Sequence, residues 1–132
     1  MSELEPELLA LEAAARSVRE LAYAPYSKFL VGAALRADNG QLFVGCNVEN
    51  ASYGATICAE RSAILAMVAA GQRAITALAV FTDADTLAMP CGLCRQVISE
   101  FQENARLLVA NPRQRRVLMF AEIFPEPFVL DR

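Results

Sequence analysis

Apolar residues near the start of the chain recur at intervals of three and four. They are Leu4, Leu8, Leu11, Ala15, Val18 and Ala22. This spacing puts them on one face of a helix and predicts an amphipathic helix over residues 3–22. Pro25 then ends the helix in a loop, because the residue before a proline disfavours helical backbone.

The next segment has the pattern of a β-hairpin. Phe29–Ala37 and Gln41–Cys46 are mainly apolar runs of strand length. The turn between them contains Asn39 and Gly40, two residues that accept a positive φ. A polar loop, residues 47–56, follows the hairpin.

The second half of the chain alternates helix and strand patterns. Helix-forming residues predict helices over residues 57–70 and 91–104, the first ended by Gly71 and the second opened by Pro90. Strands are expected at 75–82, 106–110 and 116–120, with a short helical turn after the last one. This order predicts an α/β fold, a three-layer α/β/α sandwich whose mixed five-stranded sheet has helices on both faces.

Composition limits the kinds of partner. The chain has 132 residues, of which 55% are hydrophobic, enough for one domain over residues 1–132. Its net charge of -3 disfavours binding to long nucleic acid, which depends on neutralising phosphates. We expect the dense group Arg113, Arg115 and Arg116 to lie on a solvated turn.

No stretch reaches the roughly 18 apolar residues of a membrane span, so no membrane partner is expected. The N-terminus carries Glu3, Glu5 and Glu7 and lacks the pattern of a secretory signal, which predicts a cytoplasmic protein. Thiols stay reduced in the cytoplasm, so paired cysteines there more often bind metal or take part in chemistry than form disulfides.

Three cysteines carry the strongest chemical signal. Cys91 and Cys94 fall on the first turn of a predicted helix, and Cys58 falls at the start of the preceding one. Thiolates are favoured at helix starts, and three of them bind zinc with one position left for water. The chain has no histidine, which excludes every histidine-containing zinc site.

Other roles for the cysteines remain open on spacing alone. The Cys91–Cys94 pair is also compatible with a redox pair or with two buried thiols. A structural zinc would need a fourth ligand, for which Cys46 is the remaining cysteine. We expect Cys46 to be a small buried residue of its strand instead.

Two charged residues next to Cys58 complete the candidate centre. Glu60 is close enough to move protons without binding the metal, although a solvent-exposed helix-start glutamate has the same pattern. Three thiolates and one Zn²⁺ leave a charge of minus one, which calls for a nearby cation. We hypothesise that the Arg61 guanidinium donates to the thiolates. Arg95 is the next candidate, and a surface arginine is the alternative.

The combination Cys58-Ala59-Glu60 and Pro90-Cys91-Gly92-Leu93-Cys94 resembles the small, homotetrameric, zinc-dependent cytidine deaminases. The resemblance runs from Leu21 to Phe128. It implies one Zn²⁺ per subunit and hydrolysis of cytidine and deoxycytidine to uridine and deoxyuridine plus ammonia, as in pyrimidine salvage. Glu60 would then pass a proton from water to the ring nitrogen and to the leaving amine.

The resemblance also implies contacts to a nucleoside substrate. Asn47 and Glu49 would hold the ribose hydroxyls, and Phe29 would pack on the pyrimidine ring. The backbone around Ala59 and Pro90 would read the edge of the base.

Two further residues are implied to join the subunits of a homotetramer, so that its sites are shared. Tyr53 would link neighbouring sites. Phe128 would enter the site of a neighbour, although the preceding Glu126-Pro127 departs from the commoner glycine-alanine type.

Three other classes of function compete with this interpretation: other deaminases of the same superfamily, a zinc-stabilised interaction module and a thiol-redox protein. A nucleotide or nucleic-acid deaminase typically begins its motif with histidine, and no glycine-rich phosphate loop is visible here. Blasticidin deaminases share the three cysteines but resemble the chain less at Asn47 to Glu49. A zinc-stabilised interaction module would have no use for Glu60, and a thiol-redox protein would require a thioredoxin-like context.

Overall fold

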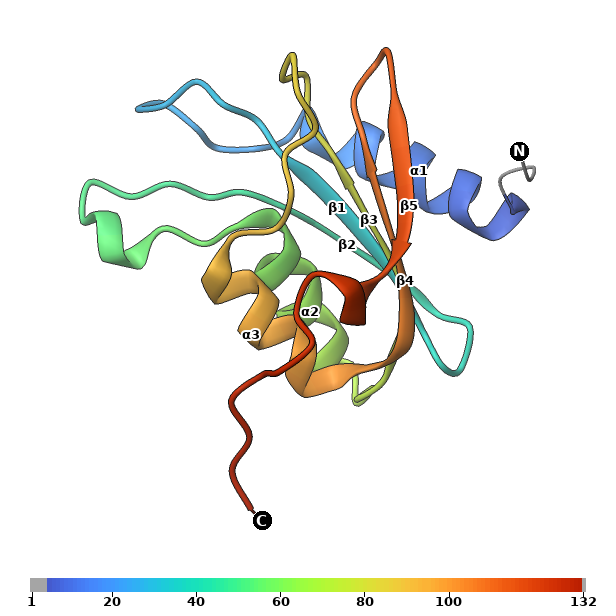
Figure 1. The fold of residues 1–132 in the computed structure, drawn as a ribbon. Helices are drawn as coiled ribbons and strands as arrows, with labels where there is room; N and C mark the ends of the chain where they lie inside the picture. Colours follow the sequence, from blue (N-terminus) through green and yellow to red (C-terminus); the bar gives the residue numbers. More distant parts are fainter. Residues whose placement is uncertain (1–4, 132) are drawn as a thin grey trace.

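A mixed sheet of five strands forms the centre of the molecule (Figure 1). The computed structural model describes residues 5–131. In spatial order the strands are β2 (Leu42–Cys46), β1 (Gly32–Ala37), β3 (Ile75–Phe81), β4 (Gln102–Ala110) and β5 (Arg115–Met119). Only β3 and β4 run parallel; the other neighbouring pairs are antiparallel.

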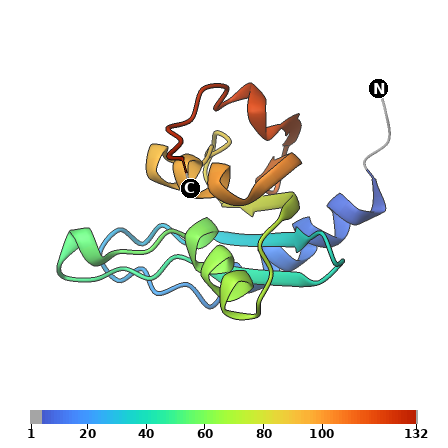
Figure 2. The same cartoon turned by 90° about the horizontal axis from the view of Figure 1, so that it is seen from below.

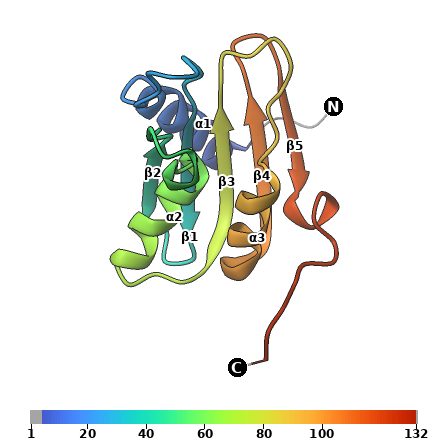
Figure 3. The same ribbon diagram turned by 90° about the vertical axis from the view of Figure 1, so that its left-hand side faces the viewer.

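Helices cover both faces of this sheet. α1 (Pro6–Arg19) lies on one face, and α2 (Ala59–Ala69) and α3 (Gly92–Phe101) lie on the other (Figures 2 and 3). Two short 3-10 helices, η1 (Tyr53–Ala55) and η2 (Phe120–Glu122), complete the described elements. The predicted three-layer α/β/α sandwich is confirmed.

The sheet has a hydrophobic core on each face, and β3 contributes residues of different size to the two cores. On the α1 face, Ala77 and Ala79 of β3 pack with buried leucines of α1. On the opposite face, Leu78 and Val80 pack with residues of α2 and α3. Because successive side chains of a strand point to opposite faces, a strand buried on both sides is a continuous apolar run.

Two glycines let helix backbones approach the hairpin. A Cβ added at Gly45 of β2 would lie 2.4 Å from the Ala63 nitrogen and 2.7 Å from the Ala59 oxygen of α2. A Cβ at Gly32 of β1 would meet the Ala15 oxygen of α1 at 1.9 Å. The positions of both helices on the sheet therefore depend on the missing methyl groups.

Several element ends differ from the sequence predictions. The first helix ends at Arg19 instead of residue 22, because the backbone turns there and Tyr23 pairs with the chain near Val48. Residues 3 and 4 of that prediction lie outside the described residues. The first strand begins at Gly32 instead of Phe29.

The second half shows similar shifts. α3 ends at Phe101 instead of residue 104, and β4 follows at Gln102 without a connecting loop. Asn104, with φ of 47°, lies inside β4 at an irregularity of its register with β3. A 3-10 helix, η1, lies within the segment that we expected to be loop throughout.

The arginine-rich segment lies at and after the turn between β4 and β5. Arg113 pairs with Asp85 at 3.3 Å, and the Arg115 guanidinium donates to both carboxylate oxygens of Glu12. Arg113, Arg115 and Arg116 are exposed, as expected, but Arg115 and Arg116 lie in β5 and not on the turn where we expected them. Among the described residues, no helix is long and apolar enough to cross a bilayer.

Candidate metal centre and active site

Three cysteine thiols converge where α2 and α3 begin. Cys58 immediately precedes α2, Cys91 immediately precedes α3, and Cys94 lies in the first turn of α3. Their sulfur atoms all lie within 4.8 Å of one another. Three sulfurs bound to one tetrahedral zinc at about 2.3 Å would lie about 4 Å apart, so this cluster fits a zinc ion.

The surroundings of the cluster favour thiolates. The N-terminal ends of α2 and α3 carry partial positive charge where Cys58 and Cys91 sit. A hydrogen bond from the Cys94 thiol, followed by the Arg61 guanidinium, lowers the pKa of Cys58 to about 5. The same bond keeps the proton on Cys94 and raises its pKa. A metal ion that replaces this proton would bind all three sulfurs as thiolates.

Arg61 reaches the cluster from the first turn of α2. Its Nη2 atom lies 3.5 Å from the Cys58 sulfur and 3.4 Å from the Thr56 carbonyl oxygen. Its Nε atom is buried and has no hydrogen-bond partner among the described residues. The guanidinium therefore has the position that the sequence hypothesis requires.

Arg95, the second candidate cation, donates hydrogen bonds to two backbone carbonyl groups. Its Nε atom donates to the Pro90 carbonyl at 2.8 Å, and its Nη1 atom donates to the Ile123 carbonyl at 3.0 Å. These bonds tie the turn before Cys91 to the start of the C-terminal tail. The sequence pattern alone did not indicate this role.

Glu60 lies in the first turn of α2 and is only 5% exposed. Burial raises the pKa of its carboxyl to about 7, with a smaller contribution from Cys58 in the same direction. A carboxyl with a pKa near neutrality can both accept and release a proton at physiological pH. Burial also excludes the alternative of a solvent-exposed helix-start glutamate. We call Cys58, Cys91, Cys94, Glu60 and Arg61 the metal centre.

Cys46 does not join this cluster. The metal-ligating group found in the described residues contains three cysteines, and Cys46 is absent from it. It lies at the end of β2 and is half-buried, where we expected full burial. A fourth cysteine ligand is therefore not available in the arrangement of this chain.

Two loops at one end of the sheet carry most of the other expected residues (Figure 1). They run side by side, joined by a bridge between Tyr23 and Val48. Phe29 lies in the first loop, and Glu49 and Tyr53 follow in the second. Tyr53 is 81% exposed and Phe29 is 42% exposed.

Asn47 and Glu49 hold the first loop in place. The Asn47 side chain accepts from the Val31 N–H and donates to the Phe29 carbonyl, both at 2.8 Å. Glu49 accepts from the backbone N–H groups of Tyr26 and Ser27 and from the Ser27 hydroxyl. The Ser27 hydroxyl bond is the main cause that lowers the Glu49 pKa, so this carboxylate is ionised.

An open cavity lies between these loops. It has a volume of about 430 Å³ and is lined by Tyr26, Ser27, Glu49, Asn50, Tyr53 and Thr56. Thr56 connects it to the metal centre, because its carbonyl accepts from Arg61. The cavity and the cysteine cluster are thus adjoining parts of one region.

A match to a protein-family model identifies the family of this chain. The model described as the cytidine and deoxycytidylate deaminase zinc-binding region matches residues 7–110. The chain belongs to this deaminase family. The resemblance inferred from the cysteine motifs is confirmed.

Similar proteins and solved structures carry names that agree with this membership. The cytidine deaminase of Sporosarcina psychrophila is 53% identical over 91 residues, 69% of this chain and 67% of its own. That of Mycobacterium tuberculosis is 44% identical over 110 residues, 83% of this chain and 80% of its own. A crystal structure of cytidine deaminase from Burkholderia pseudomallei is 43% identical, with a TM-score of 0.87, over 95% of this chain and 100% of that one.

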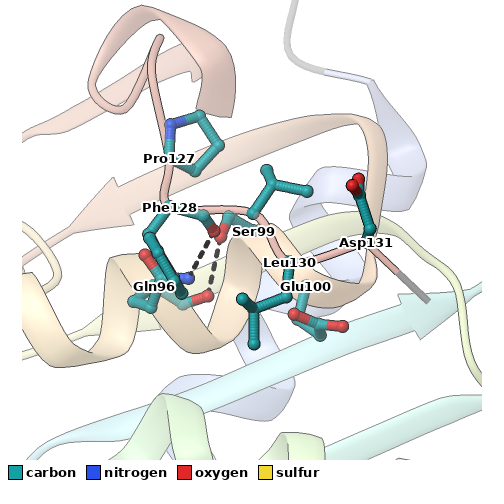
Figure 4. A pocket seen from close by; sticks show the side chains of 8 residues that line it. Gln96, Ser99, Glu100, Pro127, Phe128, Leu130 and Asp131 are labelled. Atoms are coloured by element: carbon teal, nitrogen blue, oxygen red, sulfur yellow. Dashed lines mark hydrogen bonds between the residues drawn. The ribbon is translucent and has the colours of Figure 1, made fainter.

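The remaining expected residues of this deaminase-family chain fall in two places. Ala59 and Pro90 are buried next to Cys58 and Cys91. Phe128 is 68% exposed on the C-terminal tail, and its carbonyl accepts from the Gln96 side chain at 3.0 Å. The tail lies along α3, where it borders a second cavity of about 360 Å³ (Figure 4). We call Phe29, Asn47, Glu49, Tyr53 and Phe128 the outer rim.

Sequence reasoning missed Ser27 and Thr56. Both lie in loops: the Ser27 hydroxyl donates to Glu49 of the other loop, and the Thr56 hydroxyl accepts from the Asn50 N–H within its own loop. Ser27 stands in the Leu21 to Phe29 segment that carries part of the resemblance, which was the one available signal. The bond between Ser27 and Glu49 depends on how the two loops lie together, and this cannot be inferred from spacing.

Proposed function

We propose that this protein hydrolyses cytidine and deoxycytidine to uridine and deoxyuridine, with release of ammonia. One observation carries the proposal: a buried carboxyl, Glu60, lies beside three thiols that converge within 4.8 Å. Membership of the deaminase family supports it, as do the names of the relatives. We propose that the reaction serves pyrimidine salvage, and that the protein acts in the cytoplasm.

The metal centre supplies the chemistry. Cys58, Cys91 and Cys94 would hold one zinc, and bound zinc lowers the pKa of a water ligand so that a nucleophile forms near neutral pH. Arg61, 3.5 Å from the Cys58 sulfur, would offset the negative charge of three thiolates.

Glu60 would carry the protons. It takes one proton when water adds its oxygen to carbon 4 of the pyrimidine ring, and it gives that proton to the neighbouring ring nitrogen. A second transfer, from the new hydroxyl to the amino group, lets ammonia leave and forms the carbonyl of uridine. A pKa near 7 suits a group that must accept and donate in one cycle.

The outer rim would bind the nucleoside. Phe29, in the first loop, is exposed and would pack on the ring. The backbone at Ala59 and Pro90, next to Cys58 and Cys91 in the chain, would read the base edge. Asn47 and Glu49 would hold the ribose. Each is partly engaged with the first loop, but the Asn47 amide and the Glu49 carboxylate both retain hydrogen-bonding capacity.

A homotetramer would complete the site. Tyr53 and Phe128 are large aromatic side chains that are mostly exposed in the single chain, which is expected of residues that contact a neighbouring subunit. Sites shared between subunits would cover them. Sedimentation of the zinc-loaded protein tests the tetramer, and a monomeric mass would contradict it.

A substrate panel tests the reaction. The zinc-loaded protein is incubated with cytidine, deoxycytidine, deoxycytidine monophosphate and blasticidin, and deamination is followed by absorbance. We expect turnover of the two nucleosides and loss of that turnover after the zinc is chelated. Preference for the nucleotide or for blasticidin would contradict the proposed substrate class.

A further inference from the structure

The Glu49 carboxylate is held on one side by the 24–29 loop. Its Oε1 atom accepts from the N–H groups of Tyr26 and Ser27 at 3.0 and 3.1 Å, and its Oε2 atom accepts from the Ser27 hydroxyl. An ionised carboxylate offers about four acceptor positions. Three are occupied, so one position on Oε2 remains for a further donor.

The Ser27 hydroxyl also fixes the aromatic residue of this loop. While it donates to Glu49, it accepts from the Phe29 N–H at 3.0 Å. Lys28, between them, has a φ of 63°, which a residue with a side chain adopts only where its surroundings impose it. One hydroxyl thus joins the carboxylate to the backbone of Phe29.

These groups border the cavity of about 430 Å³ beside the metal centre. Both Ser27 and Glu49 line it, so a molecule bound in the cavity would lie beside the Glu49 carboxylate. A sugar hydroxyl is a donor of suitable size for the remaining acceptor position of Oε2.

We propose that Ser27 is a positioning residue that determines sugar specificity. Its hydroxyl aims the free acceptor position of Glu49 at a sugar hydroxyl of the nucleoside. This proposal rests on the proposed function, because it presumes a cytidine-type substrate.

The test compares two substrates in a Ser27→Ala variant. Cytidine carries the 2′ and 3′ hydroxyls, and 2′,3′-dideoxycytidine lacks both. We expect the KM for cytidine to rise about tenfold while kcat stays within about twofold, because a hydrogen bond to a charged group is lost from binding alone. Dideoxycytidine, measured as substrate or as competitive inhibitor, should be affected much less.

A double variant separates positioning from general damage to the loop. If Ser27 acts through Glu49, Ser27→Ala should add little to the loss already caused by Glu49→Gln. Ser17→Ala removes the same atom from an exposed serine of α1 and should leave both substrates unaffected.

Two failures are distinguishable. Wild-type protein that does not turn over cytidine would overturn the proposed function, and this inference with it. Wild-type protein that is active, with a Ser27→Ala variant whose KM is unchanged or rises equally for both substrates, would overturn this inference alone. Full additivity with Glu49→Gln would also overturn it.

Discussion

At the metal centre every functional side chain leaves the start of a helix, whereas at the outer rim nearly every side chain leaves a loop or the tail. Cys94 and Glu60 are buried, and α2 is held against β2 through Gly45. Tyr53 and Phe128 are mostly exposed. The residues of the centre therefore lie together within one chain, whereas the exposed aromatic residues of the rim have room for the substrate and the neighbouring subunit that we propose.

The difference shows which groups can be rigid before substrate binds. Chemical groups gain most from being fixed in advance, because reorganisation during the reaction slows it. Rim residues can tighten when the substrate arrives. We therefore expect changes at the centre to lower kcat or metal binding, and changes at the rim to raise KM.

The largest effect is expected for Glu60→Gln. The amide keeps the shape of the side chain but cannot carry the proton, so kcat should fall about 10³-fold. Zinc content, measured by elemental analysis, should stay at that of the wild type. Glu103→Gln, at an exposed position of β4, is the matched control and should keep full activity. Activity that survives in Glu60→Gln would mean that another group moves the protons.

Gly45→Ala tests the rigid support of the centre. The added methyl would lie 2.4 Å from a backbone atom of α2, so the helix must shift, and we expect a loss of about 1–3 kcal/mol in the free energy of unfolding. Chemical denaturation measures it. At Gly54 an added Cβ meets nothing within 4 Å, and Gly54→Ala should change stability far less. Equal stabilities would show that the contact with α2 is not a constraint.

Arg61→Gln should weaken zinc binding about 10–100-fold, the usual range when a residue supporting metal ligands is lost. Competition with a coloured chelator gives the affinity, and turnover is measured in parallel. Arg73→Gln is the control, because Arg73 is exposed beyond the other end of α2. Unchanged zinc affinity and turnover in Arg61→Gln would remove the idea that the guanidinium supports the thiolates.

The smallest effect belongs to the rim. Phe128→Ala should raise KM for cytidine about tenfold, with little change in kcat, since the aromatic contact that we propose to the bound ligand would be lost. Val129→Ala, at the next exposed position of the tail, should change KM less.

Mixing two variants shows whose site Phe128 serves. In mixed tetramers, inactive Glu60→Gln subunits would lend their Phe128 to Phe128→Ala subunits, and the low KM should return. If mixing leaves KM high, the tail serves its own subunit or none.

The centre could be predicted from sequence because its signals are local. Cys91 and Cys94 are three residues apart at a helix start, so the helical repeat brings their thiols to one face. Glu60 lies two residues after Cys58 at the start of the preceding helix, so the sequence itself places it near that thiol. The burial of β3 on both faces was also predictable from a local signal, because its residues form a continuous apolar run. Spacing alone does not predict that the starts of α2 and α3 meet at one point, because this also depends on the order of the strands in the sheet.

The rim could not be predicted to the same depth. The hydrogen bonds of Asn47 and Glu49 to the first loop join residues that are 16 to 23 positions apart. No repeat in the sequence encodes such a contact. The direct passage from α3 to β4 at Gln102 was missed because the residues there have no marked breaker, such as glycine or proline.

Backbone contact at Gly45 also governs how α2 can move. Interlocked side chains can change rotamer and let a helix slide, but two backbones in contact have nothing softer between them to yield. The first turn of α2 should therefore travel with the β1–β2 hairpin as one body during thermal motion. Hydrogen exchange would then give the Ser62 amide, which donates to the Cys58 carbonyl at the start of α2, the slow rate of the sheet, while amides of the neighbouring loops exchange fast.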